Sequence, residues 1–229
     1  MIGAAALVVV AAGALLLLAW PGRERRAWAL AAFAGATLYF ALRGLPMLIP
    51  GPRSLGVYWN WSGHLLALAG TLVLAATLAR RIGLGARAFG FARPVALGTA
   101  AAVTALVLAL NAVLNAASGS RLGHLPVETW LFMASMPGLA EEVAFRGVLL
   151  AAAERAAPAT RVVAGVALGP GALLLTLAFV ALHGANPGTL VSVLPATMLY
   201  LWLRLKTGSV WVPIVAHNLW NLTVLAAHS

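Results

Sequence analysis

Two adjacent glutamates, Glu141 and Glu142, stand inside the apolar stretch MASMPGLAEEVAFRGVLL. A charged side chain at the depth of lipid chains costs at least ~2.5–3.5 kcal/mol on insertion scales, so this pair requires a partner or a function. Arg146 follows Glu142 by four residues, which puts both on one helical face, and we expect them to pair. Glu141 points about 100° away, toward another neighbour. A buried ion pair that locks two helices would therefore explain Glu142 and Arg146 but would leave Glu141 without a partner.

Polar side chains also interrupt two later apolar runs. The run LAFVALHG contains His183, and VPIVAHNLWNL places His217 four residues before Asn221. That spacing directs His217 and Asn221 to one helical face. Polar groups in lipid normally face the interior of a helix bundle and contact one another. We therefore expect these three residues to gather near the glutamate pair, as groups for acid–base chemistry.

The composition indicates that lipid is the solvent of this chain. Of its 229 residues, 62% are hydrophobic and 9% are charged, and the mean hydropathy is +0.97. A soluble domain carries about 25% charged residues, so this chain cannot build a water-facing surface. The formal charge is +10, but the arginines stand in short clusters between apolar runs, as in loops at a lipid headgroup surface. We expect an integral membrane protein in contact with lipid and no nucleic-acid partner.

The apolar runs predict an all-α, polytopic transmembrane helical bundle of about eight helices, with the active site in the C-terminal four. The sequence Gly169-Pro170-Gly171 interrupts the sixth run, and such residues kink or restart helices. At ~1.5 Å per residue, a straight helix from residue 161 would carry His183 past Glu141 to the outer face. A site that uses both residues therefore requires a break near Gly169-Pro170-Gly171. The expected helices cover 3–20, 27–49, 62–79, 95–116, 127–156, 161–183, 188–204 and 210–227.

The basic residues predict how the bundle sits in the membrane. No Lys or Arg precedes the first apolar run, which favours a retained first helix with its N-terminus outside over a signal peptide. Both termini are then outside, and the Ala-, Arg- and Leu-rich composition suggests a GC-rich genome and a bacterial cytoplasmic membrane. The outer side carries Arg43, Arg53 and Arg121. The inner loops carry Arg23, Arg25, Arg26, Arg80, Arg81, Arg87, Arg93, Arg155, Arg161, Arg204 and Lys206.

Four other polar residues receive structural interpretations. His64 follows Trp-Asn-Trp-Ser-Gly at a helix start, and we interpret it as interfacial. Glu128 is interpreted as a boundary charge near a helix start, where the helix dipole favours an acid. Asn111 and Asn115 are four residues apart, and we expect an interhelical hydrogen bond there rather than a wet cavity.

Taken together, three motifs in the second half resemble those of a known family. They are Glu-Glu-x-x-x-Arg (Glu141, Glu142 and Arg146), Phe-x-x-x-His (Phe179 and His183) and His-x-x-x-Asn (His217 and Asn221). In this order they resemble the CAAX protease and bacteriocin-processing family, also called CPBP or Abi, which includes the type II CAAX prenyl endopeptidases. The resemblance covers about residues 125–226. It divides one integral bundle into N-terminal transmembrane helices, 1–124, and catalytic transmembrane helices, 125–229.

The resemblance implies an intramembrane endopeptidase that hydrolyses a peptide bond with water. It implies that Glu141 is the general base, acting together with His183. It gives His217 and Asn221 the role of stabilising the oxyanion, and it makes the Glu142–Arg146 pair a support for the site. The implied partner is a peptide or protein substrate, membrane-associated or not. No residue indicates a cavity for a prenyl group, and the sequence sets no oligomeric state.

Three alternatives stay open at this point. Glu141, His183 and His217 would also make a zinc site with an open position; no HExxH motif is present, and we favour a mechanism without a metal cofactor. A catalytically silent membrane scaffold or chaperone would use the Glu/Arg/His cluster as a helix lock. A transporter would relay protons through paired Glu and His, but its typical internal repeats or matched broken helices are not found.

Overall fold

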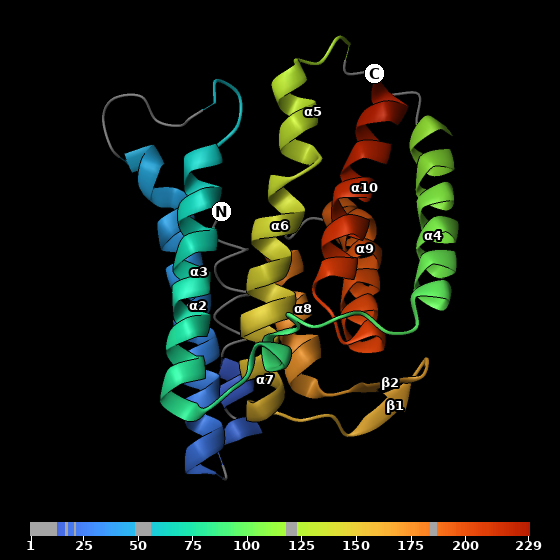
Figure 1. The fold of residues 1–229 in the computed structure, drawn as a ribbon. Helices are drawn as coiled ribbons and strands as arrows, with labels where there is room; N and C mark the ends of the chain where they lie inside the picture. The colour runs from blue at the N-terminus through green and yellow to red at the C-terminus, as the bar shows by residue number, and fades with distance from the viewer. Residues whose placement is uncertain (1–12, 17, 21, 49–55, 118–122, 184–186) are drawn as a thin grey trace.

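The structure is a computed structural model that describes residues 13–16, 18–20, 22–48, 56–117, 123–183 and 187–229. It is a bundle of helices with one short β-hairpin (Figure 1). The all-α polytopic class is thereby confirmed. Most of the expected first helix, 3–20, lies outside the described residues.

Most expected helices are present within a few residues of their expected bounds. Helices α2, α3 and α4 are long and apolar enough to cross a membrane. A one-turn 3-10 helix, η1, lies between α3 and α4. The bounds are α2 Arg23–Leu48, α3 Trp61–Ile82, η1 Ala86–Phe89, α4 Leu97–Ala117, α9 Pro187–Thr207 and α10 Trp211–His228.

A central helical column carries the glutamate pair. It consists of α5 (Val127–Met133), α6 (Met136–Glu142), the π-helical segment η2 (Val143–Leu149) and α7 (Leu150–Ala156). The expected helix 127–156 is therefore present with a short interruption after α5. Residues 141–153 are all buried, because α2, α3, α8 and α10 pack around this part of the column. A π-helical turn inside a longer helix often marks a functional site, and this one begins directly after Glu142.

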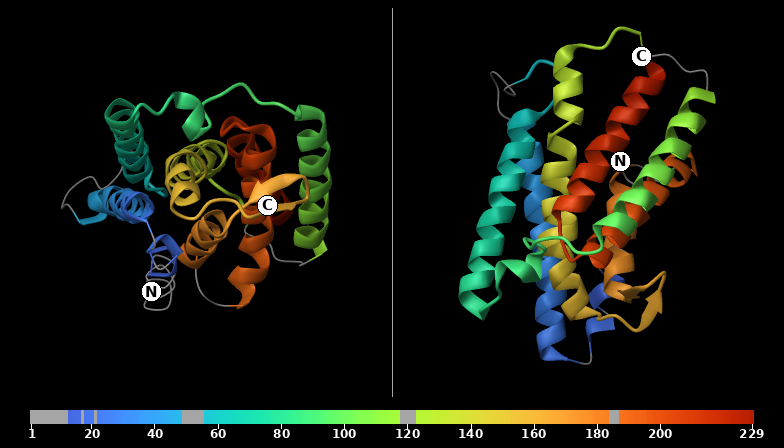
Figure 2. Two further views of the ribbon diagram at one scale, coloured as in Figure 1. Left: turned by 90° about the horizontal axis from the view of Figure 1, so that it is seen from below. Right: turned by 45° about the vertical axis from the view of Figure 1, so that its right-hand side comes forward.

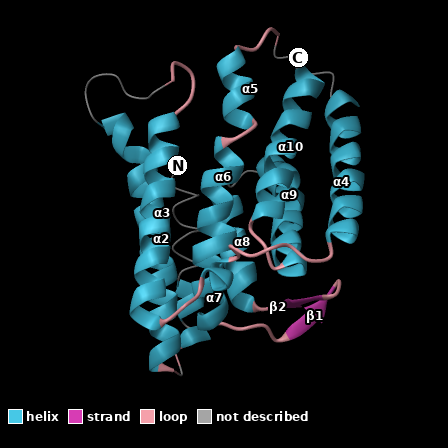
Figure 3. Cartoon of the chain, in the orientation of Figure 1, coloured by secondary structure: helices cyan, strands magenta, loops and turns pink. Residues whose placement is uncertain are grey.

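The sixth expected helix is shorter than the sequence predicted. The segment from 161 to 168 is not helical: it forms an antiparallel hairpin of β1 (Arg161–Val163) and β2 (Val166–Leu168), and α8 then runs from Pro170 to Leu182 (Figure 3). The expectation of a helix from residue 161 is wrong, whereas the expected break at Gly169-Pro170-Gly171 is confirmed. The turn residues Ala164 and Gly165 have φ of 49° and 73°, as a tight hairpin requires.

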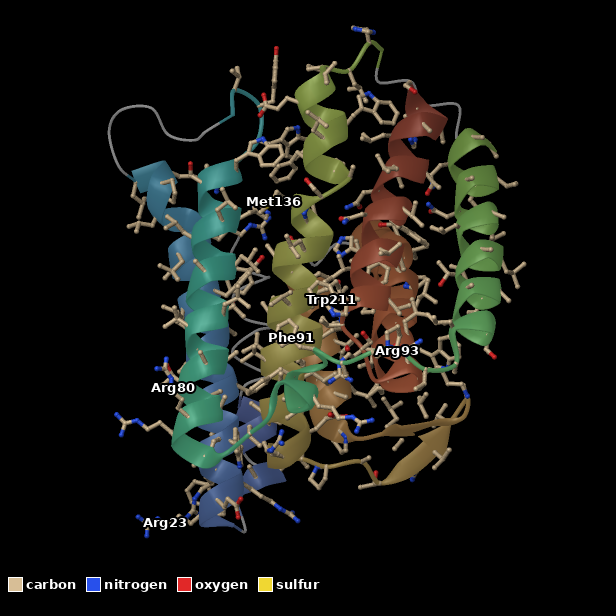
Figure 4. All side chains as sticks on the ribbon, viewed as in Figure 1. Arg23, Arg80, Phe91, Arg93, Met136 and Trp211 are labelled. Atoms are coloured by element: carbon tan, nitrogen blue, oxygen red, sulfur yellow. The ribbon has the colours of Figure 1, made fainter. Side chains whose placement is uncertain are left out.

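The ends of the bundle differ in charge. Figure 4 shows Arg23 and Arg80 at the lower end, where the hairpin also lies in Figure 1. The C-terminal end of α10 lies at the opposite end, and α4 stands at one edge of the bundle against α10, far from α2 and α3 (Figure 2). Arg23 and Arg80, both expected in inner loops, share the lower end, whereas the expected outer residues Arg53 and Arg121 lie outside the described residues. Arg204, also expected in an inner loop, is buried in the last turn of α9.

Candidate active site

The two adjacent glutamates have different surroundings. Glu142 is 0% exposed, and its Oε1 accepts a hydrogen bond of 2.9 Å from Nδ1 of His217. Its Oε2 lies 3.4 Å from Nε of Arg146. The expected pairing of Glu142 with Arg146 is therefore present, and His217 joins it from α10. We call Glu142, Arg146 and His217 the buried triad.

Arg146 connects the buried triad to two further helices. Its terminal nitrogen Nη2 donates to the carbonyl of Thr197 in α9 at 3.0 Å. Its guanidinium carbon lies 4.5 Å from the ring centre of Phe179 in α8, a cation–π contact. The backbone carbonyl of Arg146 accepts from Nε of Arg204 at 2.9 Å. The triad therefore fixes the centre of the bundle, including the ring of His217.

Glu141 faces the N-terminal helices, where local spacing identified no partner for it. Its Oε1 lies 3.3 Å from Nη1 of Arg43 in α2 and 4.0 Å from Nε2 of His64 in α3. Its Oε2 lies 4.0 Å from Nε2 of His183. The interpretation of His64 as interfacial is wrong, because this residue is only 3% exposed. The ring of His64 is held inward by the carbonyl of Asn60, at 2.8 Å from Nδ1.

One cavity of about 780 Å³ brings the expected catalytic residues together. Glu141, His183, His217 and Asn221 all line it, and so do Arg43 and His64. We call it the Glu141 cavity. The sequence missed Arg43 and His64, since no local pattern links them to a motif that begins far along the chain. Other walls are formed by Phe40, Met47, Trp59, Phe132 and Met133.

His183 reaches Glu141 because α8 starts late. From Pro170 to Leu182 the helix has 13 residues, about 20 Å at ~1.5 Å per residue. The chain therefore ends α8 at the depth of Glu141 rather than at the outer face. Nδ1 of His183 lies 3.1 Å from the carbonyl of Phe179, and its other ring nitrogen, Nε2, faces Glu141.

A second cavity, of about 570 Å³, lies between α4, α8, α9 and α10. His183, His217 and Asn221 line both cavities, so these three residues stand between them. Asn111 and Asn115 also line the second cavity. Nδ2 of Asn111 donates to Thr223 of α10 at 2.9 Å, so the expected interhelical hydrogen bond is confirmed, beside a cavity.

Two residues outside the motifs hold the site's frame. The Asn218 side-chain oxygen accepts from the backbone N–H of Gly138 at 3.0 Å, which joins α10 to the first turn of α6.

Glu128 does more than mark a boundary. Its carboxylate accepts from the backbone N–H groups of Val57, Tyr58 and Trp59 and from Nε1 of Trp61, at 3.0–3.3 Å.

The proposed zinc ligands do not fit one metal ion in this arrangement. Within the described ranges, no group of three His, Cys, Asp or Glu side chains is placed to hold a metal ion. Nη1 of Arg43 lies 3.3 Å from Glu141 Oε1 and occupies a position where a cation would bind. We derive no step through a metal.

Comparisons with known proteins bear on the second half of the chain. Residues 123–223 match the family described as Type II CAAX prenyl endopeptidase Rce1-like. No curated protein and no solved structure matches the chain. The matched segment contains all three motifs and the buried triad, and it begins after α4. Residues 123–223 are therefore similar to the Rce1-like family of type II CAAX prenyl endopeptidases, and the family resemblance that the motifs predicted is confirmed for this segment.

Proposed function

We propose that this protein is an intramembrane endopeptidase that uses Glu141 as its general base and no metal cofactor. The observation that carries the proposal is the Glu141 cavity. One carboxylate, three imidazoles, two amides and the guanidinium of Arg43 line it. The proposed substrate is a peptide or a protein segment that reaches this cavity.

The proposed chemistry uses one water molecule. Glu141 accepts a proton from this water while the water oxygen attacks the peptide carbonyl carbon. His183 helps to hold the water. The intermediate then collapses, the C–N bond breaks, and the proton on Glu141 passes to the leaving amine. The 4.0 Å separation between Glu141 and His183 leaves room for adjustment, since catalytic hydrogen bonds are often long without substrate. A positioned general base typically contributes about 10²–10⁴-fold.

His217 and Asn221 are proposed to stabilise the negative oxygen of the intermediate. They are one turn apart on α10 and line the same cavity as Glu141. Glu142 fixes the His217 ring through Nδ1, and Tyr200 stacks on it at 4.7 Å, so Nε2 has a defined direction. Removing one such donor typically costs about 10²–10³ in rate.

The two glutamates have different tasks in this proposal, and their surroundings support the difference. Glu142 lies in a closed ion-paired cluster, which supports a role as a helix lock. Glu141 lines a cavity together with a partly exposed arginine, which a lock does not require. A catalytically silent scaffold would use both pairs only to hold helices, and it would tolerate Glu141→Gln.

We further propose that the basic end of the bundle faces the cytoplasm of a bacterial cell, with the C-terminus outside. The Glu141 cavity then lies toward the outer face. Arg43 and Met47 belong to the last turns of α2, at the end opposite Arg23, and Met47 is 67% exposed. Because the chain has no cysteine, single cysteines at Arg80 and His124 test this orientation. An impermeant maleimide should label His124→Cys on intact cells and Arg80→Cys only after lysis; the reverse pattern would refute the orientation.

Cleavage of a quenched fluorescent peptide library by the purified protein in detergent tests the activity. Glu141→Gln and His217→Ala should lose cleavage, and Glu24→Gln, an exposed glutamate at the start of α2, should retain it. Chelators should have no effect. Retained cleavage in Glu141→Gln would refute the base assignment, and loss of cleavage on chelation would support zinc instead.

A further inference from the structure

The N-terminal helices bring their own polar groups to Glu141. Arg43 comes from α2 and His64 from α3, and both precede the segment that matches the protease family. Both contact the same carboxylate oxygen, at 3.3 Å and 4.0 Å. Both also line the Glu141 cavity. The catalytic carboxylate is therefore in contact with both halves of the chain.

His64 and His183 are held in the same way on opposite sides of Glu141. Each Nδ1 lies within hydrogen-bond distance of the carbonyl four residues earlier, 2.8 Å for Asn60 and 3.1 Å for Phe179. A carbonyl only accepts, so each Nδ1 carries a proton. Each Nε2 then faces a different oxygen of Glu141, and both distances are 4.0 Å.

The gap between these groups requires a donor. Nε2 of His64 and Oε2 of Glu141 are buried atoms with no hydrogen-bond partner among the described residues. Buried polar atoms are nearly always hydrogen-bonded, and 4.0 Å is too long for a direct bond. Both atoms are acceptors, so each needs a hydrogen of its own: a water molecule has two to donate, whereas a substrate N–H satisfies only one of the two atoms.

Asn60 sets the positions of both N-terminal residues. Its side-chain amide donates to the carbonyl of Arg43 at 2.7 Å, and its side-chain oxygen accepts from the N–H of Gly63 at 3.0 Å. Its own carbonyl holds His64. A Cβ at Gly63 would collide with the Arg43 carbonyl, so α2 and α3 touch closely here. The placement of Arg43 and His64 beside Glu141 is thus built into the α2–α3 contact.

We propose that Arg43 and His64 are positioning residues of the catalytic centre, which orient Glu141 and the attacking water. This rests on the proposed protease function. Arg43 compensates the charge of Glu141 in an apolar bundle and fixes the direction of its carboxylate. His64 and His183 flank the carboxylate, and the water lies between them. The catalytic centre is then composite, since the family segment supplies the reacting groups and α2 and α3 supply their orientation.

The test measures kcat and KM for purified variants on a peptide that the wild type cleaves. Arg43→Gln and His64→Leu remove the contacts, whereas Arg43→Lys and His64→Gln keep a polar group at the same place. Arg80→Gln and His124→Gln are matched controls on exposed residues far from the cavity. Because a displacement of about 1 Å in a catalytic group can cost about 100-fold in rate, kcat should fall by about that factor in Arg43→Gln. KM should change little, and the conservative variants should recover much of the loss.

Wild-type kcat in both Arg43→Gln and His64→Leu would overturn the proposal while leaving the base role of Glu141 intact, since Glu141→Gln tests that role separately. The proposal would also be overturned if kcat fell only in proportion to the fraction of folded protein and Arg43→Lys recovered none of the loss. A cycle of thermal unfolding with Arg43→Gln, Glu141→Gln and the double variant needs no substrate. The two changes should be non-additive by no more than about 1 kcal/mol, because each removes the same water-accessible contact; a double variant that is less stable than the sum of the two single changes would overturn the proposal.

Discussion

Glu142→Gln removes one charge from an ion pair that has no route to water, since Glu142 is 0% and Arg146 2% exposed. After this change Arg146 keeps the carbonyl of Thr197 and the rings of Phe179 and Tyr200 but has no carboxylate partner, and the His217 ring loses its carboxylate acceptor. Breaking a buried pair by removing one partner costs about 3–5 kcal/mol. At about 2–4 °C per kcal/mol for a chain of this size, the unfolding temperature should fall by about 6–20 °C.

Glu141→Gln should affect stability much less. Its partner Arg43 has a side chain that is 37% exposed and lines a cavity, so the freed guanidinium can be hydrated. Ion pairs with access to water contribute about 0–1 kcal/mol. The unfolding temperature should therefore change by no more than about 4 °C, although cleavage is lost.

Thermal unfolding in detergent, followed by the fluorescence of the 8 tryptophans, measures this difference. The control is the double variant Glu142→Gln/Arg146→Met, which leaves no buried charge in the pair. It should be more stable than Glu142→Gln, because replacing both partners of a buried pair is often near neutral. Equal unfolding temperatures for Glu141→Gln and Glu142→Gln would refute the distinction between a buried triad and a cavity-lining base.

Three further outcomes are expected. Glu128→Gln removes a charged acceptor from the N–H groups before α3, so hydrogen exchange at Trp59 should become faster; unchanged exchange would show that water replaces the contact. In Gly138→Ala the new Cβ meets the Asn218 side chain and the Ile214 carbonyl of α10, so we expect a loss of about 1–3 kcal/mol in the free energy of unfolding and slower cleavage. In Gly85→Ala the new Cβ has no atom within 4 Å, so this control should leave stability and cleavage unchanged. Equal effects of Gly138→Ala and Gly85→Ala would contradict the prediction. Treatment with 1,10-phenanthroline followed by gel filtration should leave cleavage unchanged, and activity restored only by added zinc would contradict the metal-free proposal.

Local sequence determined the helices and one half of the site. The few charges and the long apolar runs determine that lipid surrounds the chain. They also determine that the spans are helical, because a helix in lipid satisfies its own backbone hydrogen bonds. The spacing of four residues determined the Glu142–Arg146 pair, because residues four apart lie on the same face of one helix. The break before α8 was predictable from Gly169-Pro170-Gly171, although the hairpin of 161–168 was not.

Tertiary packing decided which glutamate faces a cavity. Glu141 and Glu142 are neighbours of the same type, so composition and spacing treat them alike. The contacts that distinguish them come from Arg43, His64 and His217, at sequence separations that no helical period covers. Helix packing sets those contacts, because the small residues at Gly63 and Gly138 let α3 approach α2 and α10 approach α6.

The sequence by itself determined that the chain spans a membrane and that its second half carries the motifs of a protease family. Only the tertiary structure decided that Glu141 stands between the imidazoles of His64 and His183 and beside Arg43 of α2. The physical reason is that a helix presents its faces by local periodicity, whereas the partner of each face depends on how distant helices pack against it.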